Sequence, residues 1–444
     1  EGASVTLAAD AALTVYAGIT NYAGATGLVT ENGASLITLG AVNGQATLKQ
    51  NISGSQWHLI SPPVTGALAG TFYQQYLQQH NEATNAYTYI TDINDVLNPV
   101  QGYAFWAVGA GFTAQYTGYP NTCDQYIALQ RTAEGNSNGW NLAGNPYPSS
   151  IDWDAPTGWT RTNISPAVYI ENNGEWATYI SGSGSTEGAG INGGSRYIAP
   201  GQGFFVNVTA TGQALLGTTD AVRVHNAAPL LKQGGNTGQV RLYVSGNGFT
   251  DETLLRFVDG ATAGFDGNYD ARKRFGLNDK SAQLYTLGGD KLAINSLPPG
   301  TGEASLCLYA RSSGTYTLAA SSPGMEVVLE DSKTGAYTSL TNQSYTFALE
   351  AGEEQQRFRL YFGTQALPQA EAAGIRVYAA GKTLYVQLGE NQHGEISVSN
   401  MAGQCITRTT HSTGNIQIPV SQPGIYLVKI VTDRQTLVRK VWVN

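Results

Sequence analysis

The sequence predicts an all-β protein made of several sandwich domains in tandem, and its composition is the first reason. Only 13% of its 444 residues are charged, whereas about a quarter are charged in typical soluble proteins. Glycine (54 residues) and tyrosine (25 residues) are abundant. Short apolar runs alternate with turn-forming residues along the chain, which favours strands over long amphipathic helices. At about 100–200 residues per domain, this length predicts three or four domains.

The first segment, residues 1–50, contains short alternating runs such as Leu13–Tyr16 and Leu36–Leu39, separated by small residues. Strands at this spacing predict either a few stacked coils of a β-solenoid-like cap or an N-terminal sheet of the next domain. Three or four coils do not form a stable solenoid alone. We therefore expect the segment to cap a longer array. The chain starts at Glu1 without a signal peptide, and we expect further sequence upstream in the precursor.

The second segment, residues 51–225, contains an internal repeat. The run Trp57–Pro63 resembles Trp140–Pro148, and further along Gln101–Trp106 resembles Gln202–Val206. In each half a strand ends at proline, which cannot donate to a β-ladder, and a glycine then leads into an aromatic strand. The repeat predicts two equivalent units that pack face to face as a β-sandwich.

The C-terminal half predicts two further domains. Residues 226–366 carry many short strands, for example Val240–Val244, and this spacing is typical of a second β-sandwich or a jelly roll. The small and polar residues 364–374 are typical of a linker. About seven short alternating strands follow in residues 375–444, which predicts an immunoglobulin-like sandwich.

Three motifs lie in the last unit: Asn400–Gln404, Pro423–Lys429 and Lys440–Val441. In their order and spacing they resemble the type A sorting domain of cargo proteins of the Bacteroidetes type IX secretion system. The resemblance covers roughly the last 70 residues. The residues to which it assigns the sorting signal are Gly403, Gln404, Pro423, Gly424, Tyr426, Lys429 and Lys440.

The middle of the chain is also similar to large surface proteins of the same bacteria. Four segments carry this similarity: Trp140–Trp153, Ile198–Val206, Thr250–Phe257 and Phe265–Lys273. The resemblance implies an extracellular protein at the outer-membrane exterior. The implied partners are the outer-membrane translocon, its shuttle barrel, a surface sortase and a lipopolysaccharide anchor. The resemblance carries no assigned activity.

No catalytic pattern stands out. The five histidines are scattered, and the sequence contains no HExxH, GxSxG or P-loop motif. The net charge is −8 and Arg272–Arg274 is the one short basic cluster, which we expect in a solvated loop. A nucleic-acid partner is therefore excluded. Three distant cysteines form no complete disulfide framework, and no apolar run reaches the roughly 18 residues of a transmembrane helix.

Acidic residues gather in the third segment. Asp251, Asp266 and Asp270 are weak candidates for calcium ligands, because calcium takes six to eight oxygens. Their spacing fits no EF-hand loop, and strand-end turns with a salt bridge to Arg256 or Lys273 explain them equally well. We expect no cofactor, and calcium is the open alternative.

Three tryptophans are candidates for ligand binding. Trp153, Trp159 and Trp176 lie in a glycine-rich part of the chain, where they are either core anchors or a platform for glycans. Asp152 and Asp154 flank Trp153, but a glycosidase needs two carboxylates on opposite sides of a sugar, which strand neighbours alone do not supply.

These observations favour a non-enzymatic, secreted cell-surface protein. The chain would be the C-terminal region of a large adhesin or fibre-like stalk, whose last domain directs export and surface attachment. Two alternatives are a non-catalytic end of a secreted hydrolase and a carbohydrate-binding module. Glycans or other cell-surface proteins are the expected binding partners of an adhesin.

Overall fold

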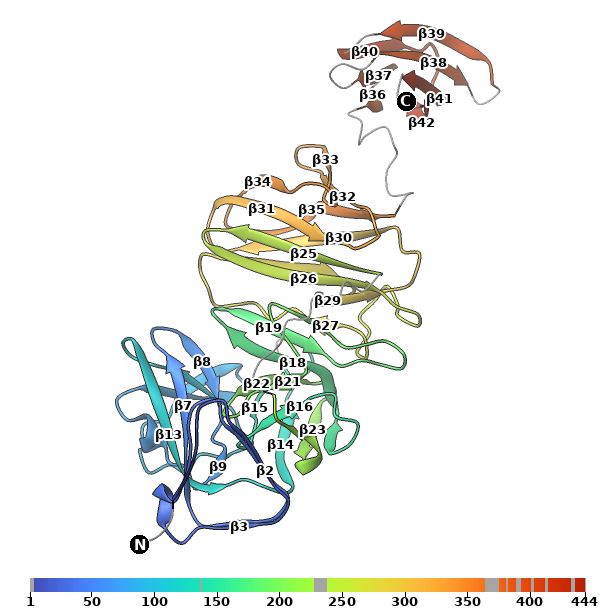
Figure 1. Ribbon diagram of the computed structural model, residues 1–444. Coiled ribbons are helices and arrows are strands. Elements are labelled where there is room, and N and C mark those ends of the chain that lie inside the picture. The colour runs from blue at the N-terminus through green and yellow to red at the C-terminus, as the bar shows by residue number, and fades with distance from the viewer. Residues whose placement is uncertain are drawn as a thin grey trace.

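The computed structural model describes residues 4–135, 138–226, 238–363, 375–380, 382–388, 393–400, 403–411, 414–432 and 436–443. Strands dominate these residues, and no α-helix occurs among them. The helical turns that they contain are the 3₁₀ segments η1 (Gly24–Thr26), η2 (Ala69–Phe72) and η3 (Asp220–Val222). The predicted all-β class is therefore confirmed. In Figure 1 the units follow one another in chain order from the blue N-terminus.

The N-terminal segment forms stacked parallel coils. The first coil holds β1 (Val5–Leu7), β2 (Ala12–Val15) and β3 (Ile19–Thr20), and the second holds β4 (Leu28–Thr30), β5 (Ser35–Thr38) and β6 (Val42–Asn43). Equivalent strands pair in parallel at one constant offset along the chain, so that Val5 lies opposite Leu28 and Ile19 opposite Val42. This is the solenoid-like geometry that the sequence predicted as one of two possibilities.

A third coil begins with β7 (Ala46–Ser53), and this strand also belongs to the next unit. On one side β7 pairs in parallel with β4, and on the other it pairs antiparallel with β13 (Gly111–Pro120). The sheet continues to β9 (Val64–Thr65). The predicted border at residue 50 therefore runs through a continuous strand. The coils and the following unit also share one core, in which Leu36 and Leu48 pack with Phe105.

The internal repeat corresponds to two equivalent strand pairs. In the first half, β8 (Trp57–Ile60) pairs antiparallel with β12 (Tyr103–Trp106). In the second half, β15 (Trp140–Gly144) pairs antiparallel with β22 (Gly203–Val208). In both pairs the tryptophan-led strand meets the glycine-led aromatic strand.

The two halves also exchange hydrogen bonds reciprocally. The N–H of Ser61 donates to the carbonyl of Gly201 at 2.9 Å, and the N–H of Gly144 donates to the carbonyl of Val100 at 2.8 Å. The chains cross so closely here that a Cβ on Gly144 would lie 2.0 Å from the Ser61 hydroxyl oxygen. Glycine at this position of the motif is therefore required by the crossing rather than by a turn.

Further strands complete sheets around the two pairs. β8 and β12 continue into β10 (Tyr76–Asn81) and β11 (Ala86–Tyr89), and β15 and β22 continue into β18 (Ile164–Asn172), β19 (Glu175–Ile180) and β20 (Ala189–Ile191). Two three-stranded sheets lie beside them, made of β14 (Gln125–Arg131), β23 (Gly212–Thr218) and β17 (Trp159–Thr162), and of β21 (Tyr197–Ile198), β16 (Ser150–Asp152) and β24 (Arg223–Val224).

The third unit is one continuous 11-stranded sheet wrapped around a core of leucine, valine and phenylalanine side chains. The sequence predicted a β-sandwich or a jelly roll here, and in the structure hydrogen bonds connect all the strands into one sheet. The strands are β25 (Gln239–Gly246), β26 (Phe249–Phe257), β27 (Ala271–Arg272), β28 (Ala282–Leu287), β29 (Lys291–Leu297), β30 (Glu303–Ala310), β31 (Gly314–Ser321), β32 (Val327–Asp331), β33 (Ala336–Ser339), β34 (Tyr345–Leu349) and β35 (Gly352–Phe362).

The second and third units are packed together through a shared apolar cluster. Trp140, Trp176 and Phe205 of the second unit contact Leu254 and Ile294 of the third. The two units therefore bury part of each other's surface, which stabilises their mutual arrangement through the hydrophobic effect.

The C-terminal unit forms two small sheets around a core of its own. One sheet holds β36 (Arg376–Ala380), β37 (Thr383–Leu388) and β40 (Gly414–Pro419), and the other holds β39 (Cys405–His411), β38 (Gly394–Asn400), β41 (Gly424–Thr432) and β42 (Thr436–Val443). This agrees with the predicted immunoglobulin-like sandwich. Among the described strands, those of this unit pair only with one another. The predicted linker, residues 364–374, lies outside the described residues.

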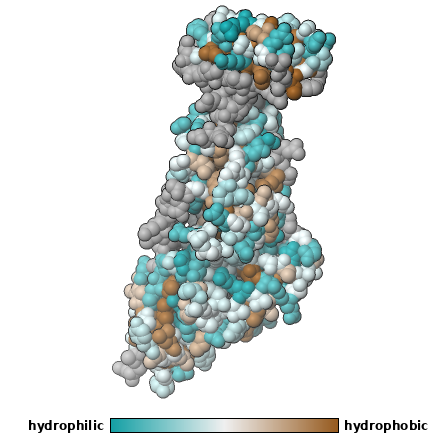
Figure 2. Space-filling view, turned by 90° about the vertical axis from the view of Figure 1, so that its right-hand side faces the viewer, coloured by the Kyte–Doolittle hydropathy of each residue, from teal (hydrophilic) through white to brown (hydrophobic). Residues whose placement is uncertain are grey.

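On the face seen in Figure 2, apolar residues form small separate patches in a largely polar or neutral surface. No helix in the described part of the chain has the length and apolar character that a membrane crossing requires.

Candidate functional site

The sorting motifs occupy a turn and the strands β41 and β42 of the C-terminal sandwich. Asn400 and Gln404 close the turn between β38 and β39, because the N–H of Gln404 donates to the Asn400 side-chain carbonyl at 3.0 Å. Gly403 has a φ of 79°, a left-handed conformation that glycine adopts without strain. Gln404 is exposed. Met401 and Ala402 of the same motif lie outside the described residues.

The second motif follows the strand alternation of β41. Pro423 is exposed just before the strand, Gly424 begins it, and Tyr426 points into the core with its hydroxyl donating to the carbonyl of Gln422 at 2.7 Å. Lys429 points outward, since its neighbours Val428 and Ile430 are buried and it is exposed. The motif therefore combines an apolar interior with an accessible lysine.

The remaining motif lies in the terminal strand. Lys440 is paired with Leu427 across β41 and β42, and its side chain lies outside the described residues. At the opposite side of this sheet, β39 is an edge strand. An edge strand exposes unpaired N–H and C=O groups, which a partner strand can use.

The three candidate tryptophans lie in the interior or partly so. Trp153 is fully buried, and its indole N–H donates to the carbonyl of Pro166 at 2.8 Å. Trp176 is buried as well and donates to the carbonyl of Phe275, whereas Trp159 is half-buried. Trp153 presents no open face, and the burial of both rings favours the core-anchor alternative over a glycan platform, although Trp176 also lines a pocket at the junction with the third unit.

The aspartates beside Trp153 are engaged in side-chain contacts. Asp152 forms a bidentate pair with Arg196, with both N···O distances at 2.6 Å. Asp154 accepts a hydrogen bond from the hydroxyl of Tyr179. These contacts give both carboxylates a structural role, as partners of Arg196 and Tyr179.

The acidic residues of the third unit hold backbone and side-chain donors. Asp251 is fully buried, is ion-paired with Lys273, and accepts hydrogen bonds from the Leu284 N–H at 2.6 Å and from the Asn192 side chain at 2.8 Å. Asp270 accepts from the N–H groups of Asp266 and Ser296.

These contacts favour the structural interpretation of the acidic residues over the calcium interpretation. Burial raises the pKa of Asp270 to about 6. Within the described ranges, no group of three or more His, Cys, Asp or Glu residues could hold a metal ion.

A buried carboxyl group lies where the second and third units meet. Glu175 on β19 accepts hydrogen bonds from the Gln283 side chain, which lies 108 residues away on β28. Burial, with the nearby Asp251 carboxylate, raises the pKa of Glu175 to about 7. The sequence contained no signal for this contact, because its two residues lie in different predicted domains.

We expect Glu175→Gln to change the pH dependence of stability. From about pH 4.5 to pH 7 the folded chain binds more protons at Glu175 than the unfolded chain, so stability falls as pH rises through this window. The variant should match the native protein near pH 4 and be more stable, by about 3 kcal/mol at most, above pH 7. Thermal unfolding across this pH range measures the difference. The exposed Glu326→Gln serves as the control, and an offset independent of pH would contradict the prediction.

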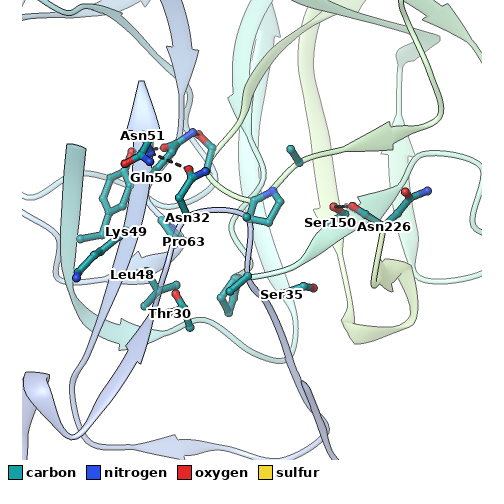
Figure 3. A pocket seen from close by; sticks show the side chains of 17 residues that line it. Thr30, Asn32, Ser35, Leu48, Lys49, Gln50, Asn51, Pro63, Ser150 and Asn226 are labelled. Atoms are coloured by element: carbon teal, nitrogen blue, oxygen red, sulfur yellow. Dashed lines mark hydrogen bonds between the residues drawn. The ribbon is translucent and has the colours of Figure 1, made fainter. Parts of the chain in front are cut away.

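A polar pocket of about 190 Å³ lies between the coils and the repeat unit (Figure 3). Several of its polar groups are bonded to one another or to the backbone. Asn32 accepts from the N–H of Asn51 at 2.8 Å, Ser150 donates to the carbonyl of Asn226 at 2.7 Å, and Lys49 is paired with Glu31. We interpret this pocket as a gap at the boundary between two packed units rather than as a ligand site.

The basic cluster Arg272–Arg274 is not a solvated loop, and that expectation is wrong. Lys273 is buried in its ion pair with Asp251. The Arg274 guanidinium lies over the rings of Phe205, Trp176 and Trp140, at 3.7, 4.5 and 4.9 Å from their centroids. The sequence did not reveal this, because the rings come from strands far away along the chain.

The fold and the terminal unit together define a multidomain β-protein that ends in a small sandwich carrying a secretion motif. The chain belongs to the family described as domain of unknown function DUF8693, which matches residues 1–362, and it ends in a secretion system C-terminal sorting domain, which matches residues 380–444.

Two known proteins give further comparisons. The chain is 26% identical over 362 residues to minor fimbrium subunit Mfa5 of Porphyromonas gingivalis, a match that covers 72% of this chain and 29% of that protein. A solved structure of a β-glucuronidase from Ruminococcus gnavus aligns over 88% of this chain and 47% of its own, with 9% identity and a TM-score of 0.15. A likeness of that size carries no argument about fold or activity.

The sorting domain and the fimbrial relative confirm the predicted family and location. The chain is cargo of the type IX secretion system, and it is secreted and exposed at the cell surface.

Proposed function

We propose that this chain is the non-enzymatic C-terminal region of a surface adhesin or fimbrial component. Its packed units form a stem, and its last domain carries the export address. The observation that carries the proposal is a terminal sandwich with a core of its own, matched by the sorting-domain family and placed after a tightly packed β-array. The relative named as a minor fimbrium subunit supports a role in a surface appendage.

Stiffness is the property that a stem requires, and the packing supports it. The coils share a strand and a core with the repeat unit, and the repeat unit shares a core with the 11-stranded sheet. Large shared apolar interfaces restrict motion between domains. The array from the first coil to β35 would therefore present whatever it binds at a set distance from the anchoring end.

The accessible parts of the sorting domain would dock into the secretion machinery. The exposed Gln404, Pro423 and Lys429 and the edge strand β39 are the features available to the translocon and its shuttle barrel. A surface sortase would then exchange the domain for a lipopolysaccharide anchor. The mass of the mature surface protein tests this step, because it shows whether residues 375–444 remain.

Deletion of residues 375–444 in the producing bacterium is expected to abolish surface display. The deletion removes the secretion signal, whereas the packed units before it keep their own cores. Protease accessibility on intact cells and immunoblotting of cell fractions measure the result. A fusion of residues 364–444 to an unrelated periplasmic reporter should bring the reporter to the surface. Display of the truncated protein at the native level would overturn the proposal.

A further inference from the structure

A second pocket, of about 440 Å³, lies where three parts of the chain meet. The hairpin of β10 and β11 contributes Asn85 and Tyr87, and the sheet of the second repeat half contributes Trp140 and Trp176. The loop that follows β27 and the start of β29 supply the other walls from the third unit. Junctions between domains are preferred positions for ligand sites, because concave surfaces form there.

The pocket is positively charged in a protein whose net charge is −8. Four basic side chains line it, Arg272, Lys273, Arg274 and Lys291, against the single acidic side chain of Asp290. Asp290 pairs with Arg272 at 2.7 Å, and the Lys273 charge is balanced by Asp251. Among the described residues no carboxylate is paired with the Arg274 guanidinium, and its electrostatic neighbours are tyrosine hydroxyls.

Arg274 is held in place but is not fully satisfied. Three aromatic rings surround its guanidinium, and the Tyr87 hydroxyl is its hydrogen-bond partner. Its Nε atom is buried and has no partner among the described residues. Burial lowers the pKa of Arg274 to about 10, so the group remains charged at neutral pH. A buried charge without a counter-ion is costly, and a bound anion would relieve that cost.

We propose that this pocket binds an acidic sugar, with the sugar carboxylate at Arg274. A guanidinium fits a carboxylate through two parallel hydrogen bonds. The half-buried rings of Tyr87 and Phe275 offer apolar walls to the C–H face of a pyranose, and the Asn85 amide offers a hydrogen bond to a hydroxyl. A phosphate or an acidic side chain would leave these aromatic walls uncovered, which is why the sugar is the better fit.

Galacturonate is the probe for this site, and galactose is its uncharged counterpart. Tryptophan fluorescence and isothermal titration calorimetry on the full chain measure binding, since Trp140 and Trp176 lie in the pocket wall. We expect galacturonate to bind saturably and galactose to bind at least about tenfold more weakly. N-acetylglutamate stands for an acidic side chain and inorganic phosphate for a phosphate group, so these two probes test the alternative anions.

Variants separate the role of Arg274 from its contribution to folding. Arg274→Gln should weaken galacturonate binding at least about tenfold, as expected for a lost charge-assisted contact. Asn85→Asp adds a negative charge at the exposed rim without touching the packed arginine, and it should also weaken binding. Asn85 has a φ of 47°, which aspartate tolerates. Asn163→Asp is the matched control, because Asn163 is exposed, has a φ of 58°, and lies outside the pocket.

Several outcomes would overturn the proposal. One is that the folded chain does not bind galacturonate saturably, or binds galactose as tightly. Another is that phosphate or N-acetylglutamate binds more tightly than galacturonate. The last is that folded Arg274→Gln and Asn85→Asp bind galacturonate as tightly as the native chain does. The pocket shares no residue with the sorting domain. Its failure would therefore leave the proposed export role untouched, and a failed deletion experiment would leave the pocket untouched.

Discussion

Replacing Asp251 with asparagine is expected to destabilise the chain by about 3–5 kcal/mol, the usual cost of breaking a buried ion pair from one side. Asp251 and Lys273 are almost wholly inaccessible, so the variant would remove the ion-pair partner of a buried lysine. The substitution keeps the side-chain shape, which limits the effect to charge and hydrogen bonding. The N–H of Leu284 and the amide of Asn192 would also lose a charged acceptor.

Calorimetry would follow the unfolding transition of the unit that holds Asp251. Asp279→Asn is the matched control: Asp279 is exposed, and its contact with Arg311 is long at 3.8 Å, so its loss should cost less than about 1 kcal/mol. Stability should not depend on added calcium or on a chelator in either protein. Equal effects of the two substitutions, or a calcium-dependent difference for Asp251→Asn, would contradict the structural role assigned to this carboxylate.

Trp153→Ala is expected to cost about 3–5 kcal/mol, as large-to-small changes of buried aromatic residues do. The indole is fully buried, and its ring centroid lies 4.7 Å from that of Trp159 and 5.9 Å from that of Phe204. The Arg161 guanidinium lies over the same ring at 4.6 Å. The substitution would open a cavity, remove the indole hydrogen bond to Pro166, and leave Arg161 with only the more distant Trp159 ring, at 5.8 Å.

Chemical denaturation of the purified chain measures this loss. Tyr22→Ala is a suitable control, because Tyr22 is 95% exposed and its truncation creates no cavity. If Trp153→Ala were as stable as the native protein and instead lost affinity for a glycan, the core assignment of this tryptophan would fail.

The contacts of Asp251 and Glu175 show how the second and third units are held together. Asp251 binds groups of the second and third units at once, and Glu175 reaches Gln283 across the same junction. The junction therefore combines an apolar cluster with buried polar contacts that fit in one relative position of the two units. Such contacts favour a single arrangement of the two units, which the proposed stem needs if it is to hold the proposed binding pocket at that junction.

Local patterns in the sequence determined the all-β class, the repeat and the terminal sandwich. Alternation with a period of two specifies which side of a strand is buried, and turn residues such as Gly403 specify where the chain reverses; both depend on neighbours a few residues apart. The repeat was visible because each half keeps the same order of tryptophan, proline and glycine. The sorting motif was visible for the same reason, since its residues lie close together along the chain.

Tertiary structure alone decided which strands share a sheet and which charges share a pocket. The sequence placed a domain border inside β7 because nothing local distinguishes a strand that pairs with two units from one that pairs with one. It placed Arg274 in a solvated loop because its aromatic cage comes from Trp140, Trp176 and Phe205, each distant in sequence. Burial and pairing depend on the residues that the folded chain brings together, and spacing along the chain does not encode those neighbours.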